Sequence, residues 1–221
     1  MTRVLPLLLL GACVIETGNP ELDVQLAVTG TSSTERVAVD GAPELELTGA
    51  YVIVDDTRLV EAEGCETVGE VEYGAEGPFA VDLLAADPFT VAIRARATDY
   101  CRLRVRLDRA DGTPAGFPAG MDDNAVFLEG TRADGVPFVL RSRERFEFDL
   151  RSAAGFPIDE AHRQLVLGFD LGTWLTTIDL ASASPGGDGV VRVDEDNNES
   201  LLEAFEEGVE AVLELYDDED G

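Results

Sequence analysis

The chain holds a single histidine, His162, and three cysteines, and these residues limit the catalytic chemistry that the protein can perform. A Ser-His-Asp triad would have to use His162, which sits in a polar turn just before an apolar segment. The Gly-x-Ser-x-Gly sequence that presents the nucleophile in many hydrolases is absent. One histidine and no close pair of cysteines also cannot supply the three or four ligands of a zinc site. We therefore predict that the protein is not an enzyme.

Residues 194–200, Asp-Glu-Asp-Asn-Asn-Glu-Ser, place oxygen-bearing side chains at alternate positions, Asp194, Asp196 and Asn198. Carboxylate and amide oxygens are the ligands that Ca²⁺ prefers, and this spacing is typical of the start of a twelve-residue calcium loop. Such a loop also needs glycine at its sixth position and a bidentate glutamate at its twelfth, where this chain has Glu199 and Phe205. We therefore interpret the segment as an acidic loop and helix cap. A calcium site, shared with acidic residues near the C-terminus, is the alternative, and no other cofactor is predicted.

The charge balance excludes some partners. The chain has 45 acidic residues against 16 basic ones, a formal net charge of −29, and it contains no lysine. Phosphate backbones and anionic lipid headgroups would be repelled, so nucleic-acid binding is excluded. With so many acids, pairs of carboxylates will occur by chance, so their presence does not indicate glycoside hydrolysis.

The first twelve residues have the layout of an export signal. Arg3 is followed by the apolar run Val4 to Leu10 and by the small residues Gly11 and Ala12. A transmembrane helix needs about 20 apolar residues, so this run is too short to span a bilayer. The sequence Leu10-Gly11-Ala12-Cys13 resembles the lipobox of bacterial lipoproteins.

This resemblance implies that residues 1–12 are a signal peptide and that Cys13 becomes the lipid-modified N-terminus of the mature chain. Several acyl chains on one residue give stable membrane anchoring. Val14 follows the lipidated position. By the sorting rule of enteric lipoproteins, from which other bacteria can differ, the lack of aspartate at this position implies the outer membrane. Residues 13–21 would then be a lipidated tether. The membrane is the partner that the resemblance implies, and an envelope protein or polysaccharide partner remains unidentified.

Once Cys13 is lipidated, Cys65 and Cys101 remain as an even pair in an oxidising compartment. Cys101 begins an alternating segment and lies on the same predicted face as Leu103 and Val105, which should be buried. We predict a disulfide between Cys65 and Cys101, and two separate buried thiols are the alternative.

Alternation of apolar and polar residues predicts a mainly β domain over residues 22–193. The clearest segment runs from Val91 to Ala97, and Asp134-Gly135 is typical of a two-residue hairpin turn. Arginines on the outward faces should form cross-strand charge pairs with neighbouring carboxylates. Many short strands separated by turn residues favour an antiparallel β-sandwich, Ig-like or jelly-roll-like. The predicted strands are residues 22–29, 45–54, 78–84, 88–97, 101–109, 124–132, 136–142, 144–150 and 163–170.

Residues 194–221 differ in pattern and predict an acidic loop, an amphipathic helix and a tail packed on the same domain. Apolar residues follow helical spacing over residues 200–216, and Ser200 to Glu203 fit a capping box at the helix start. The helix should bury Leu202, Phe205, Val209, Val212 and Leu213, and Gly208 should weaken it modestly.

These patterns together predict a lipid-anchored protein of the cell envelope, a non-catalytic binding or structural module. A secreted hydrolase or a calcium-dependent carbohydrate-binding protein is the alternative. A concave face with clustered, desolvated carboxylates would favour the alternative, and a filled core with scattered surface acids would favour the module.

Overall fold

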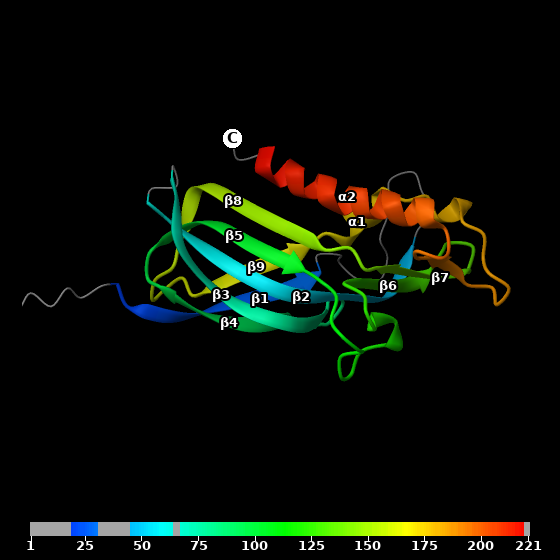
Figure 1. Ribbon diagram of the computed structural model, residues 1–221, viewed down its shortest axis with the longest axis horizontal. Coiled ribbons are helices and arrows are strands. Elements are labelled where there is room, and N and C mark those ends of the chain that lie inside the picture. The colour runs from blue at the N-terminus through cyan, green and yellow to red at the C-terminus, as the bar shows by residue number, and fades with distance from the viewer. Residues whose placement is uncertain (1–18, 31–44, 64–66, 219–221) are drawn as a thin grey trace, which may run out of the picture.

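Alternating burial along the chain produces two β-sheets that face each other (Figure 1). The computed structural model describes residues 19–30, 45–63 and 67–218. In strand β4 (Phe89–Arg96), for example, Val91, Ile93 and Ala95 are buried while the residues between them point outward. The other described strands are β1 (Glu21–Gly30), β2 (Glu46–Glu63), β3 (Thr67–Asp82), β5 (Asp99–Leu107), β6 (Val126–Thr131), β7 (Pro137–Ser142), β8 (Phe146–Pro157), β9 (Gln164–Phe169) and β10 (Val191–Val193).

The sheets are mixed rather than wholly antiparallel. The smaller sheet has the order β4-β1-β9 and the larger has the order β10-β7-β6-β2-β5-β8, with β3 pairing to β2. The pairs β1·β9 and β10·β7 are parallel, and the remaining described pairs are antiparallel. The prediction of a mainly β, sandwich-like fold with a C-terminal helix is thus confirmed. The prediction that the strands are all antiparallel was wrong. The two parallel strands both return after long connections, which local alternation does not reveal.

Strand β2 holds the larger sheet together. Its first half pairs with β6 and its second half with β5 on the same side, while β3 pairs along the other side. Register shifts between Val54 and Asp56 mark the position where the partner changes. Sequence patterns predicted a strand ending at residue 54 and missed the continuation, in which charged residues interrupt the alternation.

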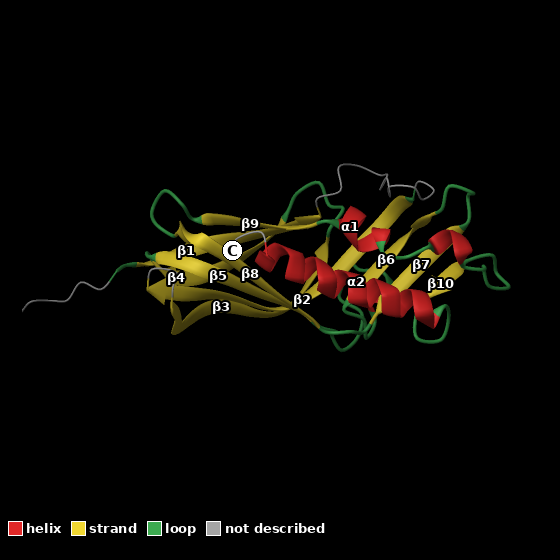
Figure 2. Cartoon of the chain, turned by 90° about the horizontal axis from the view of Figure 1, so that it is seen from above, coloured by secondary structure: helices red, strands yellow, loops and turns green. Residues whose placement is uncertain are grey.

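The inner face of the larger sheet is covered in two parts (Figure 2). The smaller sheet packs over one end, and the helices α1 (Leu171–Thr176) and α2 (Glu199–Asp218) lie over the other. A line of aromatic rings joins the two parts, because Phe169 contacts both Phe148 and Trp174 edge-on at 5.4 Å between ring centroids. The apolar side chains beneath both covers form one continuous core.

The β6–β7 hairpin shows a small departure from prediction. The N–H of Arg132 donates to the carbonyl of Val136 at 2.9 Å, so the turn has three residues rather than the predicted two. Gly135 takes a left-handed conformation with φ of 81°, which glycine adopts without steric cost. The buried guanidinium of Arg132 also donates to the carbonyls of Leu180 and Ala183, each at 2.8 Å. This arginine therefore fixes the segment after α1 to the hairpin.

Helix α2 begins one residue earlier than predicted. The carbonyl of Asn198, rather than of a later residue, accepts the first helical hydrogen bonds, from the N–H groups of Leu201 at 2.8 Å and Leu202 at 3.3 Å. Leu202, Phe205 and Val209 are buried as predicted. The side chains of Val212 and Leu213 lie outside the described residues.

Gly208 has a packing role that the sequence did not indicate. A Cβ atom at this position would lie 2.3 Å from the side chain of Thr177, so the missing side chain lets α2 approach the segment after α1. Within the described residues no helix is both long enough and apolar enough to cross a membrane.

Candidate functional site

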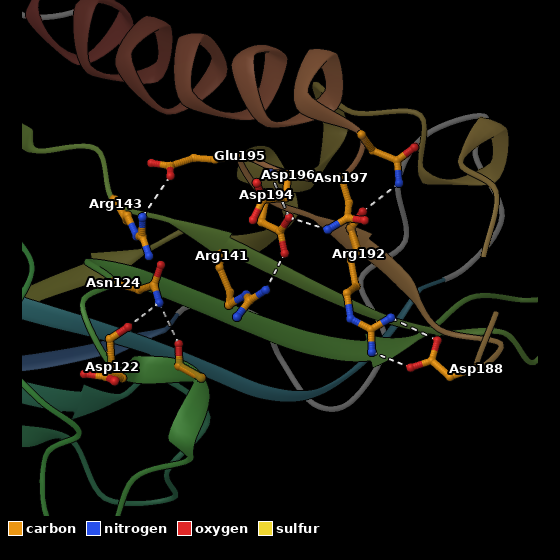
Figure 3. A network of polar contacts seen from close by, with 12 residues as sticks. Asp122, Asn124, Arg141, Arg143, Asp188, Arg192, Asp194, Glu195, Asp196 and Asn197 are labelled. Carbon is orange, nitrogen blue, oxygen red and sulfur yellow. Dashed lines mark hydrogen bonds and ion pairs between the residues drawn. The ribbon is translucent and has the colours of Figure 1, made fainter. Parts of the chain in front are cut away.

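The predicted acidic loop lines a polar hollow at the end of the larger sheet (Figure 3). The hollow has a volume of about 270 Å³. Strand β7 supplies Arg141, and the residue directly after the strand is Arg143. The turn between β10 and α2 supplies residues 194–196. The segment before β6 closes the third side with Asp122 and Asn124. We call this feature the polar hollow.

A tight turn positions the acidic side of the polar hollow. The backbone N–H of Asp194 donates to the carbonyl of Asn197 at 2.9 Å, and the reverse bond measures 3.1 Å. Oδ1 of Asp194 accepts from the backbone N–H of Asp196 at 3.1 Å and from the Asn197 amide at 2.7 Å. Oδ2 of Asp194 pairs with the guanidinium of Arg141. Both carboxylate oxygens of Asp194 are therefore engaged within the protein.

The ionisation of Asp194 follows from these contacts. Burial alone would raise its pKa, but the hydrogen bonds from Asn197 and Arg141 outweigh burial and hold the pKa of Asp194 below its usual value. A carboxylate stabilised in this way acts as a structural acceptor rather than as an acid or base near neutral pH.

The predicted calcium ligands Asp194, Asp196 and Asn198 have separate contacts. While Asp194 holds Arg141, the amide of Asn198 donates to the carbonyl of Arg192 at 2.6 Å. Asn198 has a positive φ of 52° and directs the chain into α2. Throughout residues 19–30, 45–63 and 67–218, no group of three or more His, Cys, Asp or Glu side chains is arranged to hold a metal ion. The segment forms an acidic turn that leads into α2.

The basic side of the polar hollow is also internally paired. Arg143 contacts Glu195 at 2.9 Å and Asp123 at 3.5 Å. The sequence did not predict that arginines at the end of β7 would contact this loop, because more than 50 residues separate Arg141 from Asp194. The opposite charges alone could have suggested such a pairing, but they could not have selected these arginines.

A second hollow adjoins the first and contains a carboxyl group with a raised pKa. Glu206 of α2 faces the end of β7, where the Ser142 hydroxyl donates to its Oε1 at 2.6 Å. Burial raises the pKa of Glu206, and the nearby charges of Glu144, Glu195 and Glu203 raise it further, while the Ser142 bond opposes them. This hollow measures about 590 Å³ and is open to solvent along α2.

The outer face of β3, β2, β5 and β8 carries a ladder of arginine–carboxylate pairs that we call the arginine–carboxylate face. The prediction of cross-strand charge pairing is confirmed here. Each pair neutralises an outward arginine with a carboxylate of the same strand or of a nearby strand of the sheet, and Arg104 of β5 reaches across β2 to Glu72 of β3. The pairs are Arg58 with Asp56 and Glu76, Arg104 with Glu72, Arg106 with Asp55, and Arg102 with Asp149.

The remaining candidate residues lie apart from these hollows. The side chain of His162 is 63% exposed and contacts Asp159 at 3.0 Å. It is a surface residue, as predicted. Cys101 is buried in β5, beside Tyr100, which pairs with Glu61 of β2. Cys13 and Cys65 lie outside the described residues, so lipid attachment and the disulfide remain predictions.

Comparison with known proteins gives little further information. No protein-family model and no curated protein matches the chain. Among solved structures, MbnP from Methylosinus trichosporium is similar over 77% of this chain and 82% of its own length. The two chains are 15% identical and superpose with a TM-score of 0.43, a similarity too low to carry a functional argument.

Proposed function

We propose that this protein is a non-catalytic binding or structural module that acyl chains on Cys13 anchor to the outer membrane of a bacterium. The anchor rests on the lipobox-type sequence Leu10 to Cys13. The module rests on the chemistry of the described surface.

The observation that carries the non-catalytic part is the internal pairing of the charged groups in both the polar hollow and the arginine–carboxylate face. Asp194 is held by Arg141, and Arg143 is held by Glu195 and Asp123. A catalytic acid or base needs a free side chain with a pKa near the working pH and a substrate position beside it. Groups that already neutralise each other are better suited to fixing surface shape and charge for recognition.

The proposed anchor would keep the domain close to the membrane. Only residues 14–20 separate Cys13 from the first residue of β1, Glu21. Fully extended, seven residues span at most about 25 Å. The large negative charge would meanwhile keep the domain surface from lying flat on anionic lipids.

Membrane fractionation tests the anchor. The wild-type chain should partition into the detergent phase, while Cys13→Ser should leave it. The double variant Cys65→Ser/Cys101→Ser serves as the control, because it removes the other two cysteines and retains the lipid site. If Cys13→Ser stays in the detergent phase with the wild type, the lipid anchor is rejected.

Crosslinking in intact cells tests the module. A tethered module should capture one reproducible neighbour in the envelope, and that neighbour should be lost in the Cys13→Ser variant, which no longer sits at the membrane. A capture pattern identical to that of an unrelated outer-membrane lipoprotein would contradict a specific binding role.

One observation favours the alternative of a hydrolase or a calcium-dependent carbohydrate-binding protein. The raised pKa of Glu206 in an open acidic hollow is what a general acid needs. Polysaccharide binding, measured with calcium and with a chelator, tests the calcium-dependent binder. Polysaccharide turnover, compared between the wild type and Glu206→Gln, tests the hydrolase. Calcium-dependent binding or Glu206-dependent turnover would replace the module by this alternative.

A further inference from the structure

Strand β9 is an edge strand with an unusual outer side. It pairs with β1 along one edge, and no described strand pairs with the other. Val166 in its centre is 67% exposed, the most exposed large hydrophobic side chain among the described residues. From Gln164 to Phe169 the strand contains no charged residue, in a chain with a net charge of −29.

The other described edge strands are protected by charge. Soluble proteins usually place charged side chains on edge strands, because unpaired backbone groups otherwise attract another strand. Each of the other edges follows this rule, and β9 alone among the described edges departs from it. The protecting residues are Arg94 and Arg96 on β4, Glu72 and Glu76 on β3, Glu147 and Asp149 on β8, and Arg192 on β10.

The backbone N–H and C=O groups of β9 point alternately to the β1 side and to the free edge. The carbonyl of Arg163 accepts from the N–H of Gln25 in β1 at 2.7 Å. Successive residues of a strand direct their N–H and C=O groups to opposite edges, so Leu165 and Leu167 also face β1. The N–H and C=O groups of Gln164, Val166 and Gly168 therefore face the free edge.

We propose that this edge pairs antiparallel with β9 of a second copy of this chain, with Val166 of one copy opposite Val166 of the other. In this register Gln164 lies opposite Gly168 of the other copy, and both pairs exchange backbone hydrogen bonds. The exposed Val166 side chains then cover each other on the outer face. The two three-stranded sheets become one continuous sheet across the dimer.

The lack of like-charge contacts along the paired edges favours a second copy as the occupant. The same register places His162 of one copy opposite Asp170 of the other, so no two residues of like charge lie opposite each other at either end of the pairing. On the inner side, Leu165 lies opposite Leu167 of the other copy. Beside this position an apolar groove of about 280 Å³, lined by Leu150 and Phe156 among others, can receive partner side chains.

The overall negative charge predicts how the dimer responds to salt. Two copies that each carry −29 repel one another, but the Debye length falls from about 30 Å at 0.01 M to about 8 Å at 0.15 M ionic strength. Because the pairing edge itself is uncharged, raising the salt concentration should strengthen the dimer rather than weaken it.

Sedimentation of the full chain in neutral detergent tests the proposal. The wild type should reach a monomer–dimer equilibrium that shifts toward the dimer as sodium chloride rises. Val166→Arg places like charges directly opposite each other. It should therefore weaken the dimer and raise its dissociation constant by about tenfold or more. Val71→Arg is the matched control, since Val71 is the other exposed large hydrophobic of the described residues, at 43%, and lies on β3. A monomeric wild type, or equal dimerisation of Val166→Arg, would overturn the proposal.

Cysteine crosslinking tests the register. Opposite residues in a hydrogen-bonded antiparallel pair have Cα atoms about 5.5 Å apart, within disulfide range. Val166→Cys should therefore yield a covalent homodimer under oxidising conditions. Gln164→Cys should not, because the two thiols would lie about 13 Å apart along the strands. If Val166→Cys forms only adducts with other proteins, or no more homodimer than Gln164→Cys, β9 does not pair in this way.

Discussion

The Ser142 hydroxyl donates to Oε1 of Glu206 at 2.6 Å, and this bond joins the end of β7 to α2. Ser142 is fully buried and also accepts the backbone N–H of Glu144 at 3.0 Å. A partly buried carboxylate surrounded by Glu144, Glu195 and Glu203 is unfavourable when it is ionised, so the raised pKa of Glu206 links the stability of the protein to pH.

The pH dependence of Glu206 has a defined sign. A carboxyl group with a raised pKa in the folded state contributes stability below its unfolded pKa of about 4.5, and loses it as pH rises through the folded pKa. Glu206→Gln should therefore raise the melting temperature at pH 7 and change it little at pH 4. Thermal melts at both values measure this, with the exposed Glu207→Gln as the control. A lower melting temperature of Glu206→Gln at pH 7 would show that the ionised carboxylate is stabilising.

Removing the Phe205 ring should destabilise the fold strongly. The ring is fully buried and meets Trp174 edge-on, with 6.1 Å between centroids. Phe205→Ala should lower the free energy of unfolding by about 3–5 kcal/mol in urea denaturation. Leu201→Ala, on the same helix but only half-buried, should cost clearly less. Equal losses in the two variants would mean that α2 does not dock through Phe205.

Calcium should not stabilise the polar hollow. Both Asp194 oxygens are already engaged, by Arg141 on one side and by Asn197 and Asp196 on the other. Melting temperatures in calcium and in magnesium at equal ionic strength should therefore coincide, because only screening of the net charge remains. A rise specific to calcium that Asp196→Ala abolishes would establish the calcium alternative.

A disulfide between Cys65 and Cys101 should be found in the exported protein. The disulfide would close a loop of about 37 residues, and such a closure should stabilise the fold by about 3–4 kcal/mol. Digestion without reduction should yield one peptide pair linked through these two cysteines, and the double variant Cys65→Ser/Cys101→Ser should unfold at lower urea. Alkylation of both thiols in unfolded, unreduced protein would contradict the pairing.

Local patterns predicted much of the fold but not its connections. Strands such as β4 and β5 alternate strictly, so periodicity located them, and Leu202, Phe205 and Val209 marked the buried side of α2. Helix α1 was missed because six residues are too few to show helical spacing. The parallel pairing of β1 with β9 depends on contacts between distant segments, which no local pattern records.

The candidate site was predictable to a similar degree. Composition and spacing indicated an acidic turn before α2, and the turn is there. Its partner Arg141 comes from β7, and the neighbouring Ser142 binds Glu206, so the chemistry of both hollows depends on tertiary packing. An unpaired loop of oxygen ligands and a loop neutralised by arginine look alike in the sequence.

The lipid anchor on Cys13 can be measured as the intact mass of the wild-type protein extracted from membranes. The proposed anchor predicts a chain that starts at Cys13 and carries the added mass of a diacylglycerol and further acyl chains. A chain that retains residues 1–12, or one whose Cys13 is unmodified, would contradict it.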